Sequence, residues 1–163
     1  MHVTAASALL GLLVVPLWFS ACTPANSLNG SMEDLTALSF TNVAVKLQGS
    51  SVVIEYENFV DGGGNIPFEL TYNTQGAALD GGTSFLLDAG TRSGRPAAVA
   101  SRTVVGDTRT FSPIDRGYLN IDTPVVEGET ASGNFFAVFS YQNDGSLGSG
   151  RTVYGNFQAT VTK

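Results

Sequence analysis

Three side chains that often carry chemistry occur once each in this sequence. They are His2, Trp18 and Cys22, and all three lie near the start of the chain. A Ser-His-Asp triad, a Cys-His pair and a zinc site with histidine ligands each need a histidine. Beyond Cys22 the groups left for chemistry are carboxylate, hydroxyl and guanidinium. We therefore expect no enzymatic activity and no cofactor.

A pair of carboxylates is the remaining catalytic candidate. Glu55 and Glu57 stand two positions apart in the segment SVVIEYENF, so they share one face if this segment is a strand. Two carboxylates at a fixed separation can hydrolyse a glycosidic bond. Charged residues at alternate positions are also typical of the solvated outer face of a sheet. We favour the solvated face, because glycosidases usually present aromatic platforms and the only tryptophan is Trp18.

Two glycine-rich segments carry oxygen ligands that calcium prefers. DGGGN holds Asp61 and Asn65, and QNDGS holds Asn143 and Asp144. Clustered Asp and Asn side chains on loops are the usual calcium ligands, but neither segment matches the EF-hand pattern. Asp and Asn beside glycine are also common turn residues. Turns are the favoured interpretation, with calcium as the weaker alternative and no other metal expected.

The chain is acidic and lightly charged, with a net charge of −6 and 13% charged residues. Nucleic acid needs clustered Lys and Arg, so we expect no nucleic-acid partner. One local basic bias remains in Arg92, Arg95, Arg102 and Arg109. These arginines suit contact with anionic headgroups or an acidic partner, or an edge strand protected by charge. We favour the edge strand.

Apolar and polar residues alternate in at least six short segments, which are separated by turn-forming clusters such as DGGGN and NDGSLGSG. A period of two over short segments is typical of strands. The sequence predicts a single all-β domain over residues 37–163, an antiparallel β-sandwich of about seven to nine strands. The residues expected to face its core include Val43, Val45, Leu47, Val52, Ile54, Tyr56, Phe68, Leu70, Tyr72, Phe85, Leu87, Leu119 and Ile121.

A short echo near the end of the chain predicts a long terminal hairpin. GNFFAV begins at Gly133 and GNFQAT begins at Gly155. We expect Phe135 and Phe157 to be buried and close in the fold, offset along the hairpin. Tyr141 continues the inward face of the first run. Glycine in these runs indicates a bend or bulge, and the polar loop between them is expected to be exposed.

The start of the chain combines an apolar run, ALLGLLVVPLWF, with the sequence Phe19-Ser20-Ala21-Cys22. This arrangement resembles the signal peptide and lipobox of bacterial lipoproteins. The resemblance implies that Cys22 receives a diacylglyceryl thioether, that residues 1–21 are removed and that the new amine is acylated, usually with palmitate. Thr23 stands where Asp commonly retains such proteins in the inner membrane, which implies an outer-membrane location on either its periplasmic or its surface side.

Two alternatives stay open for this segment: an ordinary signal peptide cut after Ala21, and an uncleaved membrane anchor. Two or more acyl chains anchor a protein stably, whereas one anchors it weakly. Residues 22–36 then form a lipidated cysteine and a flexible tether, since TPANSLNGS is rich in turn formers. Within it, SMED predicts a short helical turn, and LTALSF equally predicts a first strand.

These patterns together favour a cell-envelope lipoprotein. Its non-catalytic β-sandwich is expected to bind or assemble other envelope components, in adhesion, motility or envelope assembly. The expected partners are membrane lipid, through acylated Cys22, and an envelope protein. The alternative is a membrane-tethered carbohydrate-active or carbohydrate-binding module that uses carboxylates.

Overall fold

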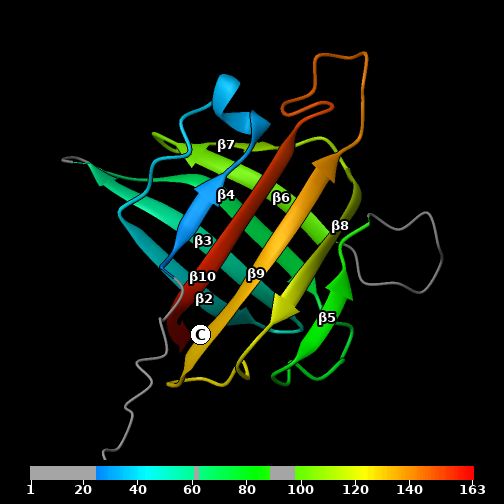
Figure 1. Cartoon of the computed structure of the whole chain (residues 1–163). Helices are drawn as coiled ribbons and strands as arrows, with labels where there is room; N and C mark the ends of the chain where they lie inside the picture. Colours follow the sequence, from blue (N-terminus) through cyan, green and yellow to red (C-terminus); the bar gives the residue numbers. More distant parts are fainter. Residues whose placement is uncertain (1–24, 61–62, 89–97) are drawn as a thin grey trace, which may run out of the picture.

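The computed structural model describes residues 25–60, 63–88 and 98–163 of the chain (Figure 1). These residues form ten strands and one short 3-10 helix, η1 (Ser31–Asp34). The strands are β1 (Ser27–Asn29), β2 (Asn42–Gln48), β3 (Ser51–Val60), β4 (Gly63–Asn73), β5 (Thr83–Leu86), β6 (Ala98–Val104), β7 (Asp107–Thr110), β8 (Ile114–Ile121), β9 (Thr130–Phe139) and β10 (Thr152–Thr162). The fold is all-β, as the alternation predicts.

The strands form two layers that face each other across one core. One layer, here called the front layer, has the order β5-β8-β9-β10, and β1 pairs with β10. The other, the back layer, has the order β2-β3-β4-β6-β7. In Figure 1 the front strands cross over the back strands at a steep angle. This is a sandwich-like arrangement.

The layers are joined at one corner by β10. Its last residues, Val161 and Thr162, pair in parallel with Val45 and Lys46 of β2. Every other strand pair in the described part of the chain is antiparallel. The sequence predicts an antiparallel sandwich, so this short parallel contact is a departure from the expectation. β10, the last strand in the chain, runs in the same direction as β2, so the two strands pair in parallel where they meet.

The core lies between the layers and uses the inward positions that the alternation predicts. Phe68 of β4 stacks on Phe135 of β9, with ring centroids 5.4 Å apart and planes 5° apart. Tyr56 of β3 meets the same Phe135 edge-on at 6.0 Å. Aromatic rings from the two layers therefore hold the sandwich together at its centre. Phe85 is only partly buried, and Leu87, fully buried, lies just after β5.

The terminal hairpin is present as predicted. β9 and β10 pair over nine successive residue pairs without a register shift, and Phe135 and Phe157 are buried. The glycines therefore mark no bulge, which was one of the two features expected of them. Tyr141 is 76% exposed, because β9 ends at Phe139. The connecting loop is also less open than expected, since Leu147 packs against the core.

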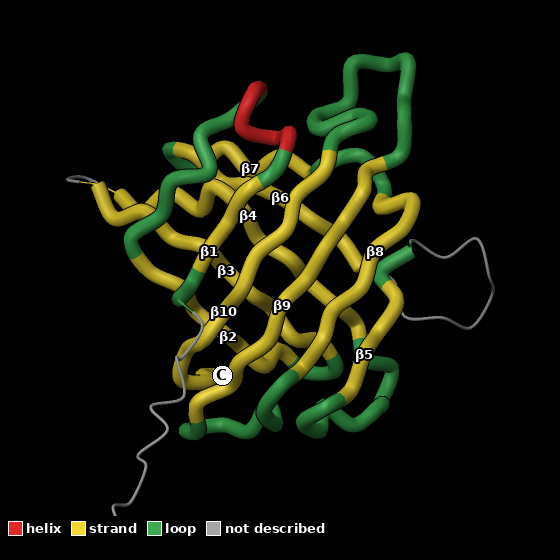
Figure 2. Tube along the Cα trace, in the orientation of Figure 1, coloured by secondary structure: helices red, strands yellow, loops and turns green. Residues whose placement is uncertain are grey.

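The chain joins the sandwich earlier than the expected boundary at residue 37. β1 pairs with β10 from Ser27 to Asn29, as Figure 2 shows. Leu28 and Met32 are buried in the core. Residues 27–34, which the sequence assigns to the tether, are thus part of the fold. The helical turn over SMED exists as η1, and LTALSF forms no strand.

Candidate functional site

The outer face of the front layer carries a row of four apolar side chains, three of them exposed and one, Phe136, half-buried. The pairing places Leu86 opposite Tyr118, Tyr118 opposite Phe136 and Phe136 opposite Tyr154, across four neighbouring strands. The rings of Tyr118 and Phe136 are 6.0 Å apart. Leu86 is 55%, Tyr118 40% and Tyr154 50% exposed. We call Leu86, Tyr118, Phe136 and Tyr154 the aromatic row.

A second row of carboxamides runs beside the aromatic row. Asn120 lies opposite Asn134, which lies opposite Asn156. The Asn120 amide donates to Asn134 Oδ1 over 3.0 Å. Successive side chains on one face of a strand are about 6.6 Å apart, so the two rows are neighbours. Together they give one sheet face with flat apolar groups and hydrogen-bonding groups side by side.

This face is suited to binding rather than to chemistry. Aromatic side chains lose little conformational entropy on binding and bury large areas. Exposed aromatic residues in a continuous group are typical of interaction surfaces. The sequence reasoning missed this group, although the segments GYLNI, NFFAV and TVYGN each place an aromatic residue on the polar side of the alternation. An aromatic residue at an outward-facing position was the sequence feature that could have indicated this surface.

The predicted carboxylate pair lies on the outer face of the back layer. Glu55 and Glu57 do share that face, and Glu55 is buried beneath its neighbours. Lys46 Nζ lies 2.5 Å from Glu55 Oε2 and 3.9 Å from Glu57 Oε1. Burial raises the pKa of the Glu55 carboxyl above its usual 4.5, Lys46 opposes that rise, and Glu57 and Glu69 add to it. The fully solvated face that we expected is therefore wrong for Glu55.

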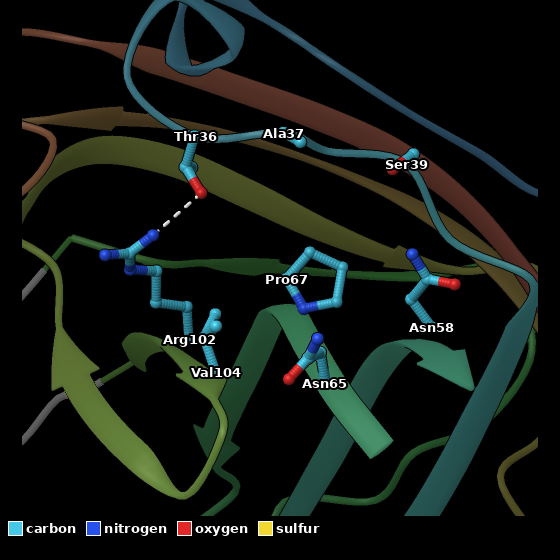
Figure 3. A pocket seen from close by; sticks show the side chains of 8 residues that line it. All are labelled: Thr36, Ala37, Ser39, Asn58, Asn65, Pro67, Arg102 and Val104. Carbon is cyan, nitrogen blue, oxygen red and sulfur yellow. Dashed lines mark hydrogen bonds between the residues drawn. The ribbon is translucent and has the colours of Figure 1, made fainter. Parts of the chain in front are cut away.

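A pocket of about 250 Å³ opens where the back layer is irregular (Figure 3). The pairing of β3 with β4 shifts between Tyr56 and Asn58, and the pairing of β4 with β6 shifts between Ile66 and Glu69. Pro67, which has no N–H for a ladder, lies in this irregular stretch. Bulges of this kind turn side chains out of the regular face. The pocket is lined by Thr36, Ser39, Asn58, Asn65, Pro67 and Arg102, among others.

Asn65 and Asp144, one from each calcium candidate segment, both accept backbone hydrogen bonds. Asn65 Oδ1 accepts the Val105 N–H over 2.9 Å, and Asp144 Oδ1 accepts the Ser146 N–H over 2.9 Å. Asn65 belongs to β4 and Asn143 lies with Asp144 in the β9–β10 loop, which are separate regions in Figure 1. In residues 25–60, 63–88 and 98–163, no three His, Cys, Asp or Glu side chains gather at a possible metal site. The Asp144 contact is turn chemistry, as the favoured interpretation expects.

Half of the arginine group is described by the structure. Arg102 of β6 lies directly opposite Arg109 of β7. Arg109 Nε bonds Asp107 Oδ2 over 2.9 Å, whereas Arg102 donates to Thr36 Oγ1 over 2.9 Å. β7 is the last strand of the back layer, so an edge strand is confirmed for Arg109. Arg92, Arg95, Asp61 and Cys22 lie outside the described residues.

Comparison with known proteins identifies no relative from which a function for these surfaces could be inferred. No family model, no curated protein and no solved structure matches the chain. In the described ranges, no helix has both the length and the apolar character needed to cross a membrane. The function is therefore argued from the surfaces themselves.

Proposed function

We propose that this protein is a lipid-anchored, non-catalytic binding module of the bacterial outer membrane. Acylated Cys22 attaches it to the membrane, and the aromatic row receives an envelope protein. The single observation that carries the binding role is the in-register alignment of exposed Leu86, Tyr118 and Tyr154 across the front layer. Such side chains remain exposed at a cost to solubility, which a bound partner removes.

The lipid anchor is supported by the sequence, and β1 fixes how many residues would separate it from the fold. The lipobox-like Phe19-Ser20-Ala21-Cys22 precedes β1, which begins at Ser27. Only a few residues then separate the lipid from the front layer, because β1 pairs with β10. This short connection keeps the sandwich close to the membrane surface and limits the partners to envelope components.

The anchor is tested by replacing Cys22 with Ser and labelling growing cells with radioactive palmitate. We expect the wild-type protein to incorporate label and to remain in the membrane pellet after washing with carbonate. The Cys22→Ser protein should incorporate none. Continued labelling of the variant would show that the lipobox interpretation is wrong.

The binding face is tested with a photo-crosslinking amino acid placed at Tyr154 in living cells. A cross-linked adduct with one envelope protein is expected, and the additional change Tyr118→Ala should reduce its yield. The matched control places the same amino acid at Tyr141, which is also exposed but lies outside the aromatic row. Equal adducts from positions 154 and 141 would argue against a dedicated face.

The carboxamide row favours a second candidate, a tethered carbohydrate-binding module. Asn120, Asn134 and Asn156 offer donors and acceptors for sugar hydroxyls beside rings on which a sugar can stack. The carboxylate-based version gains no such support, because Lys46 engages Glu55. Retention of the full chain on purified peptidoglycan, lost in Tyr118→Ala, would favour this candidate over a protein partner.

A further inference from the structure

Among the described residues that line the pocket beside Pro67, Arg102 alone carries a positive charge. Its guanidinium donates a hydrogen bond to the uncharged hydroxyl oxygen of Thr36, Oγ1, at 2.9 Å. Within the part of the chain that the structure describes, no carboxylate forms an ion pair with Arg102. The planar fork of an arginine is suited to paired contacts with oxyanions, and Thr36 uses only one of the N–H donors of Arg102.

Arg109, the neighbouring arginine of the same hairpin, does have an ion-pair partner. Arg109 lies directly opposite Arg102 in the β6–β7 ladder and is held by Asp107 at 2.9 Å. Asp107 therefore compensates the charge of Arg109 and does not compensate the charge of Arg102. The two side chains differ in setting as well, since Arg109 is 61% exposed and Arg102 lines the pocket.

The other polar side chains add donors around Arg102. Asn65 Oδ1 accepts the Val105 N–H, which fixes the orientation of the carboxamide and turns its NH₂ group away from that contact. Figure 3 shows this NH₂ group pointing toward Pro67 and the pocket, with Asn58 on the far side and Arg102 nearby. Ser39 lies on the segment above them. Arg102, the Asn65 NH₂ group and the Asn58 carboxamide therefore offer donors to the cavity, and Thr36 Oγ1 already accepts the Arg102 hydrogen bond.

We propose that this pocket binds the carboxylate group of a small ligand, with Arg102 as its charge partner and Asn58 and Asn65 as further donors. A single cation matches a single negative charge, whereas phosphate, with nearly two charges, usually meets several cations or a nest of backbone N–H groups. The volume of about 250 Å³ holds one amino-acid or sugar unit. Pro67 supplies an apolar wall for the body of that unit. This site is independent of the aromatic row.

A carboxylate of this size has two natural sources, a peptide end and an acidic sugar, and matched probes distinguish them. The full chain in detergent micelles is titrated with N-acetylalanine and with its uncharged amide, and with galacturonate and with galactose. Side-chain amide signals of Asn58 and Asn65 in ¹H–¹⁵N spectra report binding. We expect at least one acid to shift these signals with saturation and its uncharged counterpart to leave them unmoved.

Two variants assign the binding to the guanidinium. Arg102→Met keeps the apolar stem and removes the charge, and it should weaken acid binding by about tenfold or more. Arg109→Met is the matched control and should leave the affinity within about twofold. Should Arg102→Met fail to fold, as judged by its circular dichroism, Asn58→Ala serves in its place, with loss of acid binding expected.

Three results would overturn the assignment. They are equal shifts with an acid and its uncharged counterpart, binding unchanged in Arg102→Met, and Arg102-dependent binding of inorganic phosphate in place of both acids. Saturation by N-acetylalanine alone identifies a peptide end, and saturation by galacturonate alone identifies an acidic sugar. Both of these outcomes support a carboxylate site. The cross-linking result for the aromatic row does not depend on any of these binding results.

Discussion

Phe157 lies directly opposite Gly133 in the β9–β10 ladder, and two residue pairs further along Phe135 lies opposite Gly155. The centre of this exchange is the pair of Asn134 with Asn156. The repeated Gly-Asn-Phe sequence is therefore one local arrangement, repeated on both strands of an antiparallel pair. Each glycine makes room for the phenylalanine of the other strand, which explains why the echo exists without any bulge.

The first prediction concerns this close packing. A Cβ atom on Gly133 would lie 2.6 Å from Phe157 Cζ and 2.1 Å from the carbonyl oxygen of Asn120. The backbone oxygen cannot move away without disturbing the β8–β9 ladder. Gly133→Ala should therefore lower the free energy of unfolding by about 1–3 kcal/mol. Gly64→Ala is the control, because its nearest contact would be Phe59 at 3.9 Å. Urea titration of both variants measures the difference, and equal midpoints would contradict this account.

The second prediction concerns the two phenylalanines themselves. Phe135 and Phe157 are buried, at 2% and 1% exposure. Truncation of either to alanine should cost about 3–5 kcal/mol, a large share of the roughly 5–15 kcal/mol that stabilises a domain. Asp144→Ala, at an exposed position of the β9–β10 loop, should move the denaturation midpoint very little. Similar small shifts in all three variants would mean that the hairpin does not contribute to the core.

The alternation predicted the inner faces of the strands well, for a physical reason. Side chains on the core side must be apolar, so Ile54, Phe68 and Leu119 are recognisable from local sequence alone. The order of the strands depends on long-range pairing, which local patterns do not encode. The parallel contact of β10 with β2 and the docking of β1 were therefore not predictable from periodicity.

The candidate sites were less predictable than the core. Leu86, Tyr118 and Tyr154 are far apart in the chain, and only the register across three ladders brings them into one row. The pocket depends on two register shifts around Pro67, which we did not expect. Arg102 was singled out from the sequence, but its contact with Thr36 required the fold.

The third prediction concerns the segment before residue 37. Met32 of η1 is fully buried, and a Cβ on Gly148 of the β9–β10 loop would lie 2.6 Å from Met32 Cε. Met32→Ala should therefore destabilise the fold by about 2–5 kcal/mol. The neighbouring, exposed Glu33→Ala is the control and should change stability by less than about 0.5 kcal/mol. If Met32→Ala behaves like the control, residues 27–34 act as a tether after all.

The last prediction concerns the pH dependence of stability that Glu55 creates. Burial, the largest cause, raises its pKa in the folded protein above the usual 4.5. Below pH 4.5 the carboxyl is neutral in both states. As the pH rises above that value the unfolded chain ionises first, so folding loses stability until the folded pKa is passed. Glu55→Gln removes this loss, since glutamine does not titrate.

The stability of Glu55→Gln relative to wild type should therefore increase as the pH rises from 4.5, and level off once Glu55 is ionised in both states. The Lys46 ion pair forms only when Glu55 is ionised, so its effect is already contained in the net pKa shift, which it reduces without reversing. Asp144→Asn provides the opposite case. Hydrogen bonds from Ser146 lower the Asp144 pKa below 3.8, so the small stability that this exposed carboxylate contributes is lost as the pH falls below 3.8. Urea midpoints measured at half-unit steps from pH 3 to 8 give both slopes. A relative stability of Glu55→Gln that falls across this window would show that Lys46, and not burial, controls the carboxyl.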